Sequence, residues 1–204
     1  MLKIATGASV VVALLAATAA AGPAPTTPPA SADKQPAKTA SVHGSAGIFY
    51  IESPDHDIRF TVHAEQKPFT RPLPPNAPRG LSTDAWGTLE FSHTSPDGTT
   101  GWARAEVDCL VTSGRTATLT AVVTKSNVEE IGTRLGVSVQ QGEKGEPDRL
   151  GFSWGVVNVD PQNVDQNGEL VMPRTGTCMA PAPFTTVIKG GFKVVHADIR
   201  KTPA

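Results

Sequence analysis

The chain has 204 residues, in which 18 Lys and Arg stand against 19 Asp and Glu, so its formal net charge is −1. A charge this close to neutral, with no basic run longer than two residues, gives no electrostatic reason to expect nucleic acid or an anionic membrane surface as a partner.

Residues 1–21 have the pattern of a secretory signal peptide. Lys3 is the only charged residue, an apolar run centres on residues 10–15, and three alanines at 19–21 offer a small-residue cleavage site. The alternative is a membrane anchor, but the run is diluted by polar residues and falls short of the ~20 apolar residues that a spanning helix needs. We therefore expect a secreted, extracellular protein without stable membrane insertion after signal removal. Association with the cell wall stays open.

Residues 22–40 form a Pro, Ala and Thr-rich segment without a large apolar side chain. Such a segment buries too little surface to offset the entropy lost on ordering. We predict a disordered linker that leads into one folded domain, residues 41–204.

The domain is predicted to be all-β. Short segments in which apolar and polar residues alternate are separated by turn residues, and no segment has convincing helical periodicity. The expected strands are 42–51, 57–66, 85–95, the two strands of a hairpin over 101–126, 132–142, 148–157 and 185–198. Eight such strands predict a single antiparallel β-barrel or barrel-like sandwich, with closure and strand order left open. The intervening loops 67–84 and 158–184 are expected to frame the mouth of such a barrel.

The hairpin over 101–126 is expected to organise the domain. Period two puts one set of side chains of its first strand toward the core: Ala103, Ala105, Val107, Cys109 and Val111. The second strand is expected to bury Ala117, Leu119, Ala121 and Val123. Because exported chains meet an oxidising environment, Cys109 and Cys178 are predicted to form a disulfide, the alternative being two free thiols.

Two short motifs suggest chemistry, and each has a simpler interpretation. Residues 151–155, GFSWG, match the nucleophile elbow of α/β-hydrolases, but the residues after them cannot start a helix, so Ser153 is expected to be an ordinary polar strand position. Asn163, Asp165 and Asn167 resemble the first half of a calcium loop, although the twelfth position is Arg174 rather than Glu. A plain turn is the favoured interpretation of that segment.

The candidate ligand-binding residues share the outer face of the hairpin's first strand: Trp102, Arg104, Glu106 and Asp108. An exposed tryptophan beside polar groups suits carbohydrate stacking, whereas Trp154 is expected in the core. Glu106 and Asp108 would lie about 7 Å apart, a spacing open to paired-carboxylate catalysis, but salt bridges are the favoured use. The five histidines contain no metal-ligand spacing, and no cofactor is predicted.

The segment 107–117, the GFSWG strand and the run CMAPAPF at 178–184 ahead of Gly190, Gly191 and Phe192 together resemble a group of small exported proteins of high-GC Gram-positive bacteria. The resemblance implies a secreted β-domain with a Cys pair, and it implies no activity. Our hypothesis is a non-catalytic binding module for a small molecule or an envelope component. The alternatives are an extracellular hydrolase or isomerase with a carboxylate or His at the barrel mouth, and a structural envelope protein.

Overall fold

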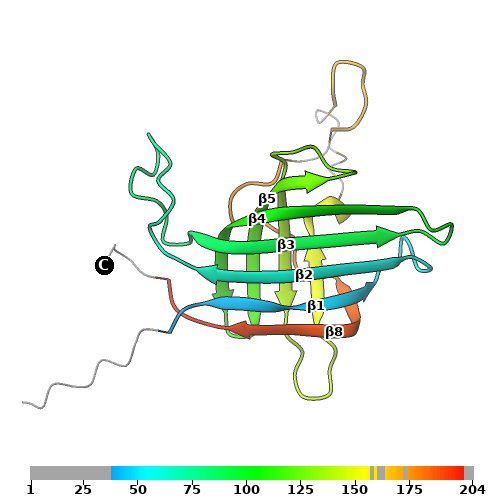
Figure 1. Cartoon of the computed structure of the whole chain (residues 1–204), viewed down its shortest axis with the longest axis horizontal. Coiled ribbons are helices and arrows are strands. Elements are labelled where there is room, and N and C mark those ends of the chain that lie inside the picture. The colour runs from blue at the N-terminus through cyan, green and yellow to red at the C-terminus, as the bar shows by residue number, and fades with distance from the viewer. Residues whose placement is uncertain (1–37, 157–158, 160–163, 172–173, 200–204) are drawn as a thin grey trace, which may run out of the picture. The chain divides into compact units, whose positions relative to one another are not determined.

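Eight antiparallel strands form a closed barrel in which each strand pairs with its neighbours along the chain and the last strand pairs with the first. A computed structural model describes residues 38–156, 159, 164–171 and 174–199. The strands are β1 (Ser41–Phe49), β2 (Asp57–Gln66), β3 (Ala85–Thr94), β4 (Thr100–Ser113), β5 (Thr116–Ser126), β6 (Arg134–Gln140), β7 (Arg149–Phe152) and β8 (Thr185–Val195). Figure 1 shows β8, β1, β2 and β3 side by side in this order. The predicted all-β class is confirmed, and the barrel is closed.

The alternation read from the sequence fills the barrel. In β2, Ile58, Phe60, Val62 and Ala64 are buried, while the residues between them are exposed or half-buried. In β5, the four residues predicted to face the core are all buried. An eight-stranded barrel has an interior that is just wide enough for side chains to fill, and large buried side chains such as Phe60, Leu119 and Leu150 occupy it here.

The predicted faces of β4 hold only for its first half. The pairing of β4 with β5 shifts between Val107 and Cys109, so Asp108 is an extra residue in the ladder. Such a bulge reverses the alternation. Beyond it Leu110 belongs to the core, Val111 is half-buried outside it, and Cys109 is buried but does not belong to the core cluster. The expected inward positions of Cys109 and Val111 were wrong for this reason.

The disulfide between Cys109 and Cys178 is confirmed, with Cα atoms 5.4 Å apart. It fastens residues 174–184, which we call the strap, to the barrel. The Cys178 amide also donates to Thr120 Oγ1 on β5 at 3.1 Å. A Cβ atom at Gly136 would collide with the Met179 carbonyl oxygen. Glycine is therefore required on β6 for the strap to pack this closely.

The seventh strand is shorter than predicted. It ends at Phe152, and Ser153–Gly155 form a 3-10 turn. Because of this turn the rings of Phe152 and Trp154 pack together with centroids 5.0 Å apart. Along a straight strand, residues 152 and 154 would lie on the same face about 7 Å apart.

The two long loops do not frame one mouth. In an antiparallel barrel of this order, successive connections alternate between the two ends. The β2–β3 connection, residues 67–84, therefore lies at the opposite end from the β7–β8 connection. Figure 1 shows the former at the left, away from the β1–β2 and β3–β4 turns at the right. The expectation of a shared mouth was wrong.

We call residues 67–84 the Pro-rich loop, and a buried carboxylate orders it. Asp84 is 2% exposed, and its Oδ2 accepts the backbone amides of Thr70, Arg71 and Leu81 at 2.9, 2.8 and 3.0 Å. The Arg71 side chain donates to the Val107 carbonyl of β4 at 2.9 Å. These bonds fix the loop against the barrel. Within the described residues, the protein has no helix of the length and apolarity that crossing a bilayer requires.

Candidate functional site

One end of the barrel is lined by aromatic rings, and we call it the aromatic end. It carries the β1–β2, β3–β4, β5–β6 and β7–β8 connections. The rings are those of Tyr50, Phe60, Phe91, Phe152, Trp154 and Phe184. Trp154 stacks at 4.8 Å from Phe91 and 5.7 Å from Phe60. Trp154 was expected in the core; it is half-buried and packs against the core cluster.

A cavity of about 180 Å³ lies among these rings. Its walls are Tyr50, Ile58, Phe60, Phe91, His93, Phe152, Trp154 and Gly155. An apolar cavity of about 150 Å³ in another protein takes up benzene. The cavity here is therefore large enough for a small aromatic molecule, and His93 is its one polar side chain other than the Tyr50 hydroxyl and the Trp154 indole N–H.

A wider depression of about 290 Å³ adjoins the cavity and shares Phe91, His93 and Trp154 with it. Here His56 Nδ1 lies 2.6 Å from His93 Nε2, so one imidazole donates a hydrogen bond to the other. Half-buried Glu129, from the β5–β6 connection, also lines this depression. Two imidazoles in contact and one carboxyl thus line the depression next to the aromatic cavity.

The surroundings tune two of these groups. Burial, with a smaller contribution from His56, lowers the pKa of His93, which favours the neutral form of the ring. Burial raises the pKa of the Glu129 carboxyl above its ordinary value. A neutral imidazole can accept a proton or a hydrogen bond from a ligand.

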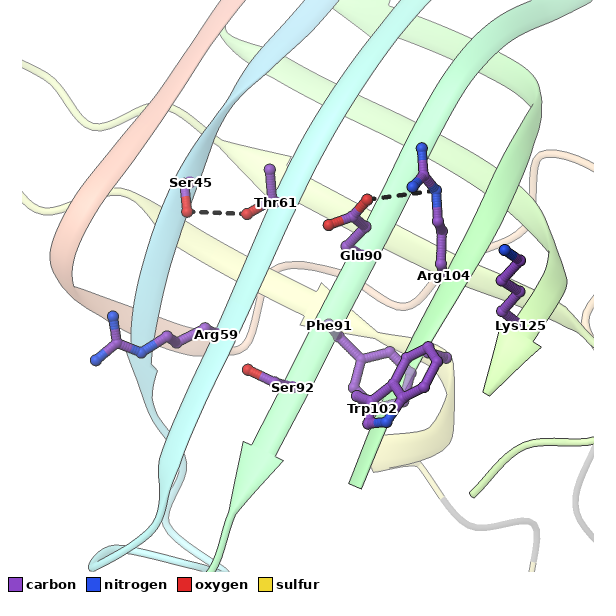
Figure 2. Close-up of a pocket in the computed structure, with 10 residues that line it drawn as sticks. Ser45, Arg59, Thr61, Glu90, Phe91, Ser92, Trp102, Arg104 and Lys125 are labelled. Atoms are coloured by element: carbon purple, nitrogen blue, oxygen red, sulfur yellow. Dashed lines mark hydrogen bonds and ion pairs between the residues drawn. The ribbon is translucent and has the colours of Figure 1, made fainter. Parts of the chain in front are cut away.

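The residues predicted to bind a ligand are only partly brought together. Trp102 and Arg104 line a shallow depression of about 450 Å³ on the outer face of β1–β5, together with Arg59, Glu90 and Lys125. Figure 2 shows Trp102, Arg104 and Lys125 on one side of this depression and Arg59 on the other. The depression is wide and open, unlike the cavity at the aromatic end.

The other two predicted ligand-binding residues lie outside that depression. Glu106 is exposed farther along β4. Asp108, the bulge residue, accepts hydrogen bonds from Arg134 Nε at 2.9 Å and from Thr120 Oγ1 at 2.6 Å. The bulge turns Asp108 toward β5 and β6, where it serves as a salt-bridge partner, so the two carboxylates do not form a pair.

The calcium-like segment forms a turn where it is described. Asp165 Oδ1 accepts the backbone amides of Asn167 and Glu169 at 2.7 and 3.0 Å, which lowers the pKa of its carboxyl. These bonds are typical of an Asx turn. Asn163 lies outside the described residues. Within the described ranges, no three His, Cys, Asp or Glu side chains are grouped to hold a metal ion.

Ser153 has a structural contact rather than the surroundings of a nucleophile. Its hydroxyl accepts the Gly136 amide of β6 at 3.0 Å, and the chain continues from the 3-10 turn into extended backbone at Val156. A nucleophile elbow requires a strand followed by a helix whose first amides face the serine. The expectation that Ser153 is an ordinary strand position was wrong, because β7 ends at Phe152 and Ser153 begins the 3-10 turn.

Sequence reasoning missed the pair of His56 and His93. A signal for His93 was present, because Leu89, Phe91 and His93 follow each other with period two and the first two were expected to face inward. Nothing local to His56 indicates its partner, which is 37 residues away.

Comparison of the chain with protein-family models, with curated proteins and with solved structures finds no match.

Proposed function

We propose that this protein is a secreted binding module that holds a small apolar or aromatic molecule at the aromatic end of its barrel. The observation that carries the proposal is the cavity of about 180 Å³ walled by aromatic rings. Ligand sites are typically concave and largely apolar, with few polar groups that fix orientation. His93 at the cavity wall would supply such a polar group, so hydroxylated aromatic compounds are the favoured ligand class.

Two features support export to the extracellular side. Disulfides such as Cys109–Cys178 persist mainly in oxidising compartments. Residues 1–21 carry the signal-peptide pattern.

The test uses a variant with one tryptophan. Trp86→Phe combined with Trp102→Phe leaves Trp154 as the only indole. Its N–H gives a single indole peak in a ¹⁵N-correlated NMR spectrum, which we would follow during titration with 2-naphthol and with cyclohexanol. We expect a saturable shift with 2-naphthol. Linear shifts with both compounds would show that no defined pocket is filled.

A pocket-filling variant with a matched control places the ligand. Ile58 lines the cavity, whereas Val62, two inward positions farther along β2, does not. Ile58→Phe should weaken 2-naphthol binding at least about tenfold, which corresponds to 1.4 kcal/mol. Val62→Ile, which adds one methylene elsewhere in the core, should leave the affinity unchanged. Equal affinities for the two variants would remove the cavity as the site.

A second candidate function is catalysis of a proton transfer, and the contact between His56 and His93 favours it. A neutral imidazole next to an apolar cavity is suited to general-base chemistry. The probe 5-nitrobenzisoxazole tests this without a cofactor. A base removes the proton on carbon 3, the N–O bond breaks, and 2-cyano-4-nitrophenolate is released. A rate that His93→Gln reduces at least about 100-fold would support catalysis, and an unchanged rate would exclude His93 as the base.

A further inference from the structure

The outer depression on β1–β5 is built from two rows of side chains that cross the sheet. In the first row, pairing is continuous from strand to strand: Ser45 with Thr61, Thr61 with Glu90, Glu90 with Arg104, and Arg104 with Lys125. In the second row, Arg59 pairs with Ser92 and Ser92 with Trp102. The first row crosses five strands and is therefore about 19 Å long, and the rows lie about 7 Å apart. Figure 2 shows both rows.

From this arrangement we propose that the outer depression binds a linear polysaccharide that carries carboxylate groups. The depression is shallow, open and extended, which suits a stretch of polymer better than a compact small molecule. The hydroxyls of Ser45, Thr61 and Ser92 lie among the charged groups and match the many hydroxyls of a sugar chain. The polar side chains of this site project from the outer face of the barrel, whereas its other lining residues, Phe91 and Ala103, belong to the core.

Trp102 supplies a fixed platform. Its side chain is 41% exposed, an uncommon exposure for so large an apolar surface. Its backbone is held on both sides: the Trp102 amide donates to Asn127 Oδ1 at 2.7 Å, and its carbonyl accepts from Ser126 Oγ at 2.8 Å. A ring on such a fixed backbone can pack against the apolar face of a sugar with little further loss of entropy.

The charge of the depression selects the class of sugar. Arg59, Arg104 and Lys125 are cationic, and Glu90 is the only acidic residue that lines the depression. Arg104 contacts Glu90 at 3.4 Å and Arg59 contacts neighbouring Asp57 at 2.8 Å, both in exposed pairs. The exposed Arg104–Glu90 pair contributes little to stability, whereas Arg59 holds Asp57 through both carboxylate oxygens. Lys125 forms no ion pair with any residue that the structure describes. A carboxylate on the sugar therefore finds an unpaired cation at Lys125 and a weakly paired one at Arg104.

The probe is a hexamer of galacturonic acid, compared with the neutral hexamer of galactose by calorimetric titration. We expect the acidic hexamer to bind at least about tenfold more tightly, and to bind more weakly as salt is added. Trp102→Ala should weaken binding about tenfold, and Trp102→Phe should restore most of it. Lys125→Gln should weaken binding about threefold and reduce the dependence on salt.

The matched control is Trp86→Ala. Trp86 is 42% exposed, also on the outer face of the barrel, but it does not line the depression. Melting temperatures of all variants report whether each one folds. Equal affinity for the two hexamers, no binding of either, or the same loss in Trp86→Ala as in Trp102→Ala would each overturn the proposal.

Discussion

Removal of the disulfide should expose how much of the domain's stability depends on the strap. The variant Cys109→Ala/Cys178→Ala keeps small apolar side chains at both positions. Cys109 is fully buried under the strap, and the strap leads directly into β8, which closes the barrel against β1. Without the disulfide, motion of the strap is therefore expected to loosen β8, the strand that closes the barrel.

The magnitude follows from the length of the closed loop. The two cysteines are 69 positions apart, and the chain-entropy relation gives about 4.4 kcal/mol for a loop of this length at 25 °C. Domains of ordinary size are stable by about 5–15 kcal/mol, so this is a large part of the total. For a domain of this size the loss corresponds to a fall in melting temperature of roughly 9–18 °C.

Cys178 adds a second, opposing contribution. Its φ of 61° lies in the left-handed region, which costs a non-glycine residue about 1–2 kcal/mol. Glycine adopts this conformation without that cost. Cys109→Ala/Cys178→Gly should therefore be more stable than Cys109→Ala/Cys178→Ala by about 1 kcal/mol.

The assay is urea unfolding followed by circular dichroism and by tryptophan fluorescence. We expect the wild-type protein, treated with reductant, to approach the double-alanine variant. A loss below about 1 kcal/mol in the double-alanine variant would show that the strap is held by its other contacts and that the disulfide adds little to stability. Unequal transitions in the two signals would indicate that the strap detaches before the barrel unfolds.

Three further predictions concern single positions. Asp84→Ala leaves three backbone amides of the Pro-rich loop without their acceptor and should lower the free energy of unfolding by about 2–4 kcal/mol, with faster hydrogen exchange in that loop as the measurement. Gly136→Ala should displace the strap at Met179 and cost about 1–3 kcal/mol in urea unfolding, whereas Gly47→Ala, where a Cβ meets only ordinary contacts, should be close to neutral. The pKa of the Glu129 carboxyl is raised in the folded state, so its ionised form opposes folding when the pH is above the ordinary pKa of 4.5. Glu129→Gln should therefore be more stable than wild type at pH 7 and lose this advantage below pH 4.5. An equal difference in stability at both pH values would show that the Glu129 carboxyl does not oppose folding in its ionised form.

The strand positions were predictable because a barrel interior and its solvent face impose period two on almost every strand. β2 illustrates this best, since its predicted bounds, 57–66, and its buried face agree with the structure. The disulfide was predictable because the chain has two cysteines and its first residues have a signal-peptide pattern. The Pro-rich loop was recognised from its prolines, but its anchor at Asp84 was not, because the amides that Asp84 accepts carry no sequence signal.

The features that could not be predicted depend on strand pairing and on contacts between residues that are far apart in the sequence. The bulge at Asp108 is invisible in the sequence, because apolar residues lie on both sides of it and either face of the strand could be the inner one. The same bulge removes Asp108 from the predicted ligand-binding set and turns Cys109 toward the strap. The aromatic end collects residues from β2, β3, β7 and the strap, and only the order of the strands brings them together. The resemblance to exported proteins of high-GC Gram-positive bacteria stays a prediction.

Binding of a small molecule at the aromatic end can be tested by native mass spectrometry of full-length protein produced in a Gram-positive host and recovered from the culture medium. We expect a protein that has lost residues 1–21 and that carries one small aromatic or apolar molecule, or takes up one equivalent of 2-naphthol, with Ile58→Phe failing to do so. A wild-type protein that stays at its bare mass, and that takes up 2-naphthol no better than Ile58→Phe does, would rule out the proposed binding function.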